Sequence, residues 1–205
     1  MRAADLEVFM AYRNDSRISR FQGWEAITRE AAVAFIKEQQ SREPFLPGQW
    51  LQIPITLKPT QALIGDCALK IHLEDPRQAT IGITLAHGFH GKGFAMEAAA
   101  TLLNYAFEEL GLHRVRADTD PQNTAAWRLL ERLGMRREAH LKQSLWFKGQ
   151  WADEYFYAIL ERQWLSCRTR VMALRLFCHH PGAGPILRRN RELETSAERI
   201  TSVTT

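Results

Sequence analysis

The chain has 205 residues, of which 45% are hydrophobic and 24% charged, ordinary proportions for a single globular domain. No apolar run approaches the ~18 residues of a membrane-spanning helix, and the first residues lack the apolar centre of a secretory signal. Cys67, Cys167 and Cys178 are odd in number and include no Cys-x-x-Cys pair, which favours a reducing, cytoplasmic compartment and argues against a zinc site. The net charge of +4 comes entirely from residues 164–205, which hold seven Arg and three Glu, so it says nothing about partners of the preceding part.

The N-terminal residues predict two helices separated by an aromatic turn. The first helix covers residues 5–13. The second follows Thr28, a helix-capping residue, and its apolar side is formed by Ala31, Ala32, Phe35 and Ile36. In the turn, Phe21 and Trp24 are either core residues or part of a binding surface, and composition alone favours neither.

Three strands are predicted next. Residues 50–57 and 63–73 are joined by a turn at 58–61, and a second turn at 74–77 leads into a third strand at Ala79. Short turns between successive strands predict an antiparallel meander.

The third strand runs into a glycine-rich loop. Its apolar residues recur with the period of two that is typical of a half-buried strand, at Ile81, Ile83 and Leu85. Gly88, Gly91 and Gly93 follow, and a helical pattern starts at Phe94. Glycine lets the backbone turn tightly and approach a ligand, and the free N–H groups at the start of a helix attract anions. This arrangement predicts a phosphate-binding loop.

The spacing of the loop excludes two common nucleotide motifs. The ATP-type loop requires Gly, four residues and then Gly-Lys-Ser/Thr, but Gly93 follows Lys92, and Ala86 occupies the earlier glycine position. The dinucleotide pattern G-x-G-x-x-G would begin at Gly91 but ends on Met96. What remains is the segment H-G-K-G-F-A, residues 90–95.

Helices and strands alternate in the remaining part. Residues 94–110 predict an amphipathic helix of about four or five turns, ended by Gly111. The elements expected after it are a strand over 112–118, a helix over 124–133 closed by Gly134, and strands over 135–141, 144–147 and 151–160, the last two joined by a hairpin turn at 148–150. A meander, a strand–helix–strand unit, a further helix and a closing hairpin indicate an α/β fold with a mixed sheet.

Three ordered segments resemble the GNAT acetyltransferases. Residues 90–95 are similar to the acyl-CoA loop of that family, with Gly93 and Ala95 matching and His90 standing where Gln or Arg is usual. Residues 120–135 resemble the family's Asp-x-x-Asn segment, and residues 146–160 are similar to the closing hairpin of the RimJ/RimL-like branch. The resemblance covers about residues 3–164 and implies a GNAT-like acyl-CoA N-acyltransferase fold, here without the family's first edge strand. We therefore expect a domain over 1–164 and a basic tail over 165–205.

The resemblance implies acetyl-CoA as co-substrate and no metal. It assigns the diphosphate to the loop residues His90, Gly91, Lys92, Gly93, Phe94 and Ala95, acting mostly through main-chain amides. The side chain of Lys92 either adds a phosphate contact or is simply solvated. Main-chain groups of Thr84, Leu85 and Ala86 would pair with the pantetheine arm as an added strand does. Asn123 and Trp127 would also contact the cofactor, with helix capping as the alternative role of Asn123.

The implied reaction is transfer of an acetyl group to a primary amine, a protein N-terminus or a small molecule, by direct attack in a ternary complex. Acceptor contacts are expected from Phe21, Trp24 and Trp146, and a homodimer is compatible with the resemblance. The catalytic groups stay unidentified, because Thr80 and Ala126 stand where the family often has Glu and Ser. The candidates for proton transfer are Asp66, His72 and Glu25.

Two other interpretations stay open. A chain without those acid and base residues could be a non-catalytic acyl-CoA-binding module. The tail has the charge of a nucleic-acid-binding segment but lacks interleaved aromatic residues, so we expect no nucleic acid, and no membrane, as a partner. Within the tail we predict a short helix over 171–177 followed by disorder. Cys178, His179 and His180 lack the spacing of metal ligands.

Overall fold

The computed structural model describes residues 1–177 and 185–187. Its helices are α1 (Leu6–Arg13), α2 (Ser16–Ser19), α3 (Arg29–Ser41), α4 (Phe94–Asn104), α5 (Thr124–Arg132) and α6 (Glu161–Phe177). Its strands are β1 (Leu51–Leu57), β2 (Leu63–Ile71), β3 (Gln78–Leu85), β4 (Arg114–Thr119), β5 (Arg136–Phe147), β6 (Gln150–Leu160) and β7 (Pro185–Leu187). Two short 3-10 helices cover Ala3–Asp5 and His87–Phe89, and a π-helical turn, Tyr105–Glu109, extends α4.

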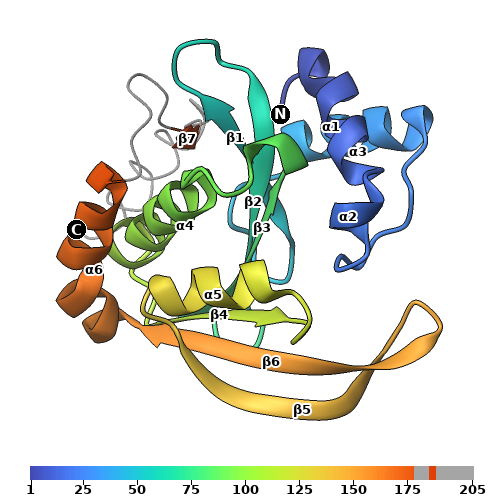
Figure 1. Ribbon diagram of the computed structural model, residues 1–205. Helices are drawn as coiled ribbons and strands as arrows, with labels where there is room; N and C mark the ends of the chain where they lie inside the picture. The colour runs from blue at the N-terminus through green and yellow to red at the C-terminus, as the bar shows by residue number, and fades with distance from the viewer. Residues whose placement is uncertain (178–184, 188–205) are drawn as a thin grey trace.

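The strands form one mixed sheet in the order β5-β6-β4-β3-β2-β1-β7. Strands β1, β2 and β3 make the predicted antiparallel meander, and only the β3–β4 pair is parallel. Figure 1 shows α4, α5 and α6 on one side of the sheet and α1, α2 and α3 on the other. The predicted mixed α/β sheet is therefore confirmed.

Each layer of helices has its own hydrophobic cluster. The larger one lies between the sheet and α4, α5 and α6, and it includes Leu102, Val115 and Trp164. The smaller one joins α1, α2 and α3 to the start of β2 around Phe9 and Ile36. Burying an aromatic or aliphatic side chain of this size stabilises a fold by roughly 1.5–3 kcal/mol. Both faces of the central strands are thus covered where the helices pack.

Several local predictions hold because they rest on local chemistry. Thr28 caps α3 by accepting from the Ala31 N–H, and Gly111 and Gly134 adopt positive φ after their helices. Lys148 and Gly149, both at positive φ, form the tight turn between β5 and β6.

Other expectations need correction. The helix predicted over 171–177 is the end of the longer α6, so the expected boundary between Trp164 and Leu165 falls inside a helix whose Trp164 is buried. The two strands expected over 135–147 are one strand with a register shift between Leu141 and Leu145. In β3 the alternation is incomplete, because Thr80 and Thr84 are buried as well. The short helix α2 was not expected from the sequence.

In the described residues no strand precedes α1, and β7 pairs with β1 at that edge of the sheet. The expected disorder after Phe177, the Cys178–His180 segment and Arg188–Arg191 lie outside the described residues. Within the part of the chain that is described, no helix combines the length and the apolar character needed to cross a membrane.

Candidate active site

The loop between β3 and α4 presents a row of main-chain N–H groups. Gly91 has φ +72° and Gly93, the N-cap of α4, has φ +84°, a backbone that residues with a Cβ adopt at a cost. The first amide of α4 that bonds within the helix is that of Glu97, which donates to Gly93 O at 3.0 Å. Among the described residues, no acceptor is bonded to the amides of residues 91–96. These amides and the positive end of the α4 dipole form a site for an anion.

Two side chains of the loop fold back onto it. His90 Nε2 donates to the Leu85 carbonyl oxygen at 2.9 Å, and Lys92 Nζ donates to the Gly88 carbonyl oxygen at 2.8 Å. Both residues are exposed, and neither bonds to a loop amide. The His90 contact braces the loop against the end of β3, and the Lys92 ammonium stays at the loop surface, within reach of an anion.

Strands β3 and β4 separate beside this loop. They are bridged only at Gln78, Ala79 and Thr80, and beyond these residues β4 no longer pairs with β3. Alternate residues of a strand direct their main-chain groups to opposite edges, and the Ala86 N–H donates to Ile64 on β2 at 2.8 Å. The groups of Ile83 and Leu85 therefore face the opened edge, whereas those of Thr84 and Ala86 face β2.

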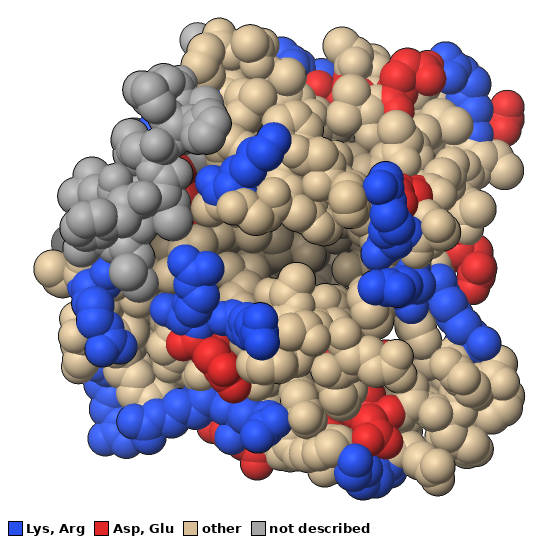
Figure 2. Space-filling model, viewed as in Figure 1, with Lys and Arg blue, Asp and Glu red and all other residues tan. Residues whose placement is uncertain are grey.

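Helix α5 borders the opening on the other side. Asn123 caps it, since its Oδ1 accepts from the Ala126 N–H at 3.3 Å, and Trp127 Nε1 donates to the Pro121 carbonyl oxygen at 3.2 Å. Figure 2 shows a hollow between the segment after β3 and α5, with an uncharged floor and Lys and Arg side chains along its two sides. The structure thus brings the glycine loop, the free edge of β3 and the start of α5 around one opening.

The predicted acceptor residues lie on the N-terminal helices and on the β5–β6 hairpin. Trp24 is half-buried, with its Nε1 donating to the Arg13 carbonyl oxygen at 3.3 Å and the Arg13 guanidinium 3.8 Å from its ring centre. Phe21 is half-buried beneath the Arg20 guanidinium at 4.4 Å. Trp146 is 60% exposed and contacts Trp151 edge to face. Trp24 is thus partly a structural residue, and Trp146 is free to contact a ligand.

The tip of the hairpin contacts the N-terminal helices. Lys148 Nζ donates to the carbonyl oxygens of Ser19 and Trp24, at 2.8 and 3.1 Å. Sequence reasoning missed this contact, because nothing local relates residues that lie 129 and 124 positions apart. It ties the hairpin tip to the segment around α2.

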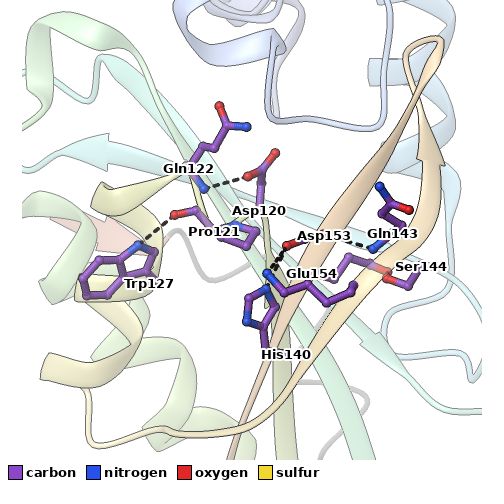
Figure 3. A network of polar contacts seen from close by, with 10 residues as sticks. Asp120, Pro121, Gln122, Trp127, His140, Gln143, Ser144, Asp153 and Glu154 are labelled. Carbon is purple, nitrogen blue, oxygen red and sulfur yellow. Dashed lines mark hydrogen bonds and ion pairs between the residues drawn. The ribbon is translucent and has the colours of Figure 1, made fainter.

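A polar network stiffens the hairpin itself (Figure 3). Asp153 accepts from Gln143 N at 3.0 Å and lies 2.9 Å from His140 Nε2 and 2.8 Å from Lys142 Nζ. These contacts hold the pKa of Asp153 well below its usual range, the Lys142 bond being the largest cause. Ser144 Oγ donates to Glu154 at 2.8 Å. The network spans the register shift in β5, so it keeps the hairpin in its bent form where pairing is lost.

The three candidates for proton transfer differ in environment. Asp66 is only 2% exposed and accepts from Tyr12 and Arg13, so its carboxylate is engaged in holding α1 on β2. His72 Nε2 accepts from Arg116 at 3.1 Å and lies 2.8 Å from Thr80 Oγ1. Burial, and then Arg116, lower the pKa of His72, which keeps the ring neutral. Glu25 is exposed in the loop after Trp24.

A carboxylate that sequence reasoning missed lies at the end of β4. Asp118 is exposed on the sheet face shared with Thr80, and among the described residues it forms no ion pair. Loss of hydration raises the pKa of Asp118, the nearby Glu154 raises it further, and Arg116 and Lys70 oppose the rise. Strand alternation could have placed Asp118 on this face, but not next to Glu154, because that requires the β4–β6 register.

An acyl-CoA ligand fits this architecture. Its diphosphate requires several unengaged donors, which residues 91–96 supply, and its amide-bearing arm requires an open strand edge, which Ile83 and Leu85 supply. The positive φ of Gly91, with open space where a Cβ would lie, allows close approach of a ligand to the backbone.

Comparison with known proteins agrees with this geometry. The model of the acetyltransferase (GNAT) domain matches residues 1–136. An uncharacterized N-acetyltransferase of Bacillus subtilis (strain 168), YnaD, is 32% identical over 162 residues, which are 78% of this chain and 90% of the relative. The [ribosomal protein uS5]-alanine N-acetyltransferase of Escherichia coli (strain K12) is 31% identical over 88 residues, 43% of this chain and 45% of the relative.

A solved structure gives the same result. The acetyltransferase (GNAT family) from Bacillus anthracis superposes with a TM-score of 0.70 and is 31% identical, covering 79% of this chain and 92% of that protein. The family model covers well over half of the chain, and the full-length relatives are named as N-acetyltransferases. The chain therefore belongs to the GNAT acetyltransferase family and is an acetyl-CoA-dependent N-acyltransferase.

Proposed function

We propose that the enzyme transfers the acetyl group of acetyl-CoA to a primary amine, either a protein N-terminus or a small-molecule amine, by direct attack in a ternary complex. The observation that carries the proposal is the opening beside β3, where residues 91–96 present free main-chain donors and β3 separates from β4. The hairpin and the N-terminal helices, which meet at Lys148, offer a separate surface for the second reactant.

Main-chain groups do most of the cofactor binding in this proposal. The amides of the loop from His90 to Ala95 hold the diphosphate, and the Lys92 ammonium adds a charge. The arm lies along the opened edge of β3, where Leu85 offers its N–H. The main-chain groups of Thr84 and Ala86, also expected to pair with the arm, instead face β2. Bound acetyl-CoA supplies an activated acyl group, and an unpaired main-chain N–H beside it would stabilise negative charge on the carbonyl oxygen.

Helix α5 would contact the cofactor from the opposite side. The Asn123 side chain uses its oxygen as a helix cap, which leaves its NH₂ group able to donate to a ligand. Trp127 is fixed by its bond to Pro121 and packs against the hydrophobic core. These two residues form a rigid border of the cofactor opening.

The acceptor would lie between the aromatic turn and the hairpin, against Phe21, Trp24 and Trp146. Support for the RimJ/RimL-like branch comes from the closing hairpin and from the partial similarity to an enzyme named as a [ribosomal protein uS5]-alanine N-acetyltransferase. An exposed, edge-to-face tryptophan pair suits a peptide chain or an aliphatic amine, because it offers apolar surface with little conformational entropy to lose.

Calorimetry and a thiol-release assay test the proposal together. Acetyl-CoA is first titrated into the protein, and free thiol is then followed with a panel of N-terminal peptides and small primary amines. We expect binding of acetyl-CoA and turnover with at least one amine. Binding without turnover on any amine would favour the non-catalytic module, and absence of binding would overturn the cofactor assignment. Salt-dependent binding to DNA or RNA that is lost on deleting residues 165–205 would instead support a nucleic-acid role.

A further inference from the structure

The proton that an acceptor ammonium must lose needs a base on the acceptor face of the sheet. An amine attacks only through its free electron pair, so the ammonium form is inert until it is deprotonated. Thr80 stands where the resemblance implies a base and Ala126 where it implies a proton donor to the thiolate, and Asp66 is already paired with Arg13. The base therefore has to come from another residue near the point where β3 and β4 separate.

The face that carries Thr80 can be followed across the sheet from the strand register. Thr80 is bridged to Arg116 on β4, and Arg116 is paired with Ala158 on β6. Side chains two residues further along each strand share the same face. The next row therefore contains Gly82 of β3, Asp118 of β4 and Phe156 of β6, with Asp118 and Phe156 directly paired.

This row lies where the two parallel strands part. The last bridged pair of β3 and β4 is Thr80 with Arg116, two residues before Gly82 and Asp118. Gly82 has no side chain, and its partner on β2 is Ala68, so the face beside Asp118 carries little bulk. A ligand arm along the opened edge of β3 passes this row on its way from the glycine loop.

We propose that the Asp118 carboxylate is the general base that takes a proton from the acceptor ammonium. The inference rests on the proposed acetyl transfer and adds the group that makes the amine reactive. The amine nitrogen then forms a bond to the acetyl carbon, the carbon–sulfur bond breaks, and the thiolate leaves with the electron pair. The nitrogen loses its second proton as the amide forms, and that proton passes through water to the thiolate. The proton on Asp118 passes to solvent, since Asp118 is exposed.

The surroundings of Asp118 suit this role. Glu154 faces it from β6, Arg116 lies next to it on β4, Lys70 faces it from β2, and β3 contributes the uncharged Gly82. Loss of hydration and the Glu154 charge raise the pKa of Asp118, and a base becomes more effective as its pKa moves toward the working pH. The two carboxylates together attract a cationic acceptor.

The other groups on this face are less available. Glu154 accepts from the Ser144 hydroxyl and belongs to the hairpin network. His72 is held by Arg116 and Thr80 on the row of Thr80, away from the separated part of the strands. Asp118 forms no ion pair with the described residues, lies where the strands separate and is exposed.

The test compares Asp118→Asn with wild type and with Asp75→Asn as a matched control. Asp75 lies in the turn at the other end of β3 and pairs with Arg77. For Asp118→Asn we expect kcat to fall about 100-fold, the lower range for loss of a general base, with unchanged calorimetric affinity for acetyl-CoA. Asp118→Glu should recover part of the rate, and Asp75→Asn should behave as wild type.

A pH profile separates a base from a structural role. Asp118 acts only when deprotonated, so kcat/KM of the wild type should fall as the pH drops through a pKa raised above that of an ordinary aspartate. That limb should be missing in Asp118→Asn. If Asp118→Asn keeps the wild-type kcat and the same acid limb, the assignment is wrong while the acetyl transfer stands. If the wild type acetylates no amine, the proposed function fails first.

Discussion

The proposed cofactor side and the proposed acceptor side of this enzyme are built from different kinds of group. On the proposed cofactor side the donors are main-chain amides of one continuous segment, residues 91–96, held by two glycines at positive φ. On the proposed acceptor side the groups are side chains from separate elements, among them Trp24, Lys148 and Asp118. The first site depends on backbone conformation, and the second depends on how distant elements meet.

This difference explains how each side can tolerate change. Amides cannot be removed by substitution, so the cofactor site is sensitive only to residues that set the backbone. Side chains can be exchanged one at a time, which makes the acceptor face the natural place for specificity to vary among related enzymes. Substitutions that affect one side and leave the other unchanged test this division.

The largest effect is expected from Arg13→Met, which leaves Asp66 buried without its partner. Breaking a buried ion pair costs about 3–5 kcal/mol, and the Arg13–Asp66 pair, at 2.9 Å, joins α1 to β2. The free energy of unfolding in urea should fall accordingly. The affinity of the folded fraction for acetyl-CoA should stay unchanged, because the glycine loop leads into α4, on the side of the sheet opposite α1.

Arg17→Met is the control, since its pair with Asp15 is exposed and holds the Asp15 pKa at about 2 without supporting the core. A loss of cofactor affinity in folded Arg13→Met would show that the two sides are coupled.

The next effect is expected from Gly93→Ala. A Cβ at φ +84° costs roughly 1–2 kcal/mol, and relief of that strain would turn the amides at the start of α4 away from the anion. Acetyl-CoA should bind about tenfold more weakly by calorimetry, since 1.4 kcal/mol corresponds to a factor of ten. Gly88→Ala is the matched control, because Gly88 lies in the same loop with open space around it and no positive φ. Equal affinities for the two variants would contradict a site made of main-chain amides.

The part of the molecule that could be predicted is the part with local causes. The glycine loop, the Thr28 cap and the Lys148–Gly149 turn follow from φ preferences and side-chain capping, which act within a few residues. The glycine loop of the proposed cofactor side belongs to this class, whereas its assignment to a diphosphate came from the resemblance to the GNAT acetyltransferases.

The acceptor side could not be predicted because its causes are not local. The contact of Lys148 with Ser19, the pairing of Asp118 with Phe156 and the continuous bent strand β5 depend on register and docking across the whole sheet. The start of α6 was missed for a related reason. Its Glu161 to Arg170 portion is mostly polar, and the helix is fixed by Trp164, which is buried and donates to Asn104 at the end of α4.

A smaller effect, confined to the acceptor side, is expected from Trp146→Ala. The side chain is 60% exposed, so its removal should hardly change the free energy of unfolding. If the indole contacts the acceptor, truncation should raise the acceptor KM about tenfold, the usual scale for an aromatic contact. The kcat and the acetyl-CoA affinity should stay as in wild type.

Steady-state kinetics with the preferred amine gives kcat and the acceptor KM. Leu73→Ala, which truncates an exposed residue on the turn after β2, serves as control. An unchanged KM would move the acceptor away from the hairpin.

The smallest effect is expected from Lys148→Ala, which removes the contact between the hairpin tip and the N-terminal helices. Two exposed hydrogen bonds contribute about 0.5–1 kcal/mol each at most, so the global stability should change little. The local result should be clearer, because Lys148 links the hairpin tip to the carbonyl groups of Ser19 and Trp24. Hydrogen exchange at residues 19–26 and at the hairpin tip should accelerate, and the acceptor KM should rise, while exchange in the glycine loop stays unchanged. Lys142→Ala is the control, because the hydrogen bond from Lys142 to Asp153 lies within the hairpin. If exchange accelerates equally in both variants, the contact between the hairpin and the N-terminal helices depends on the stiffness of the hairpin rather than on its tip, and the acceptor side would be held by the Asp153 network.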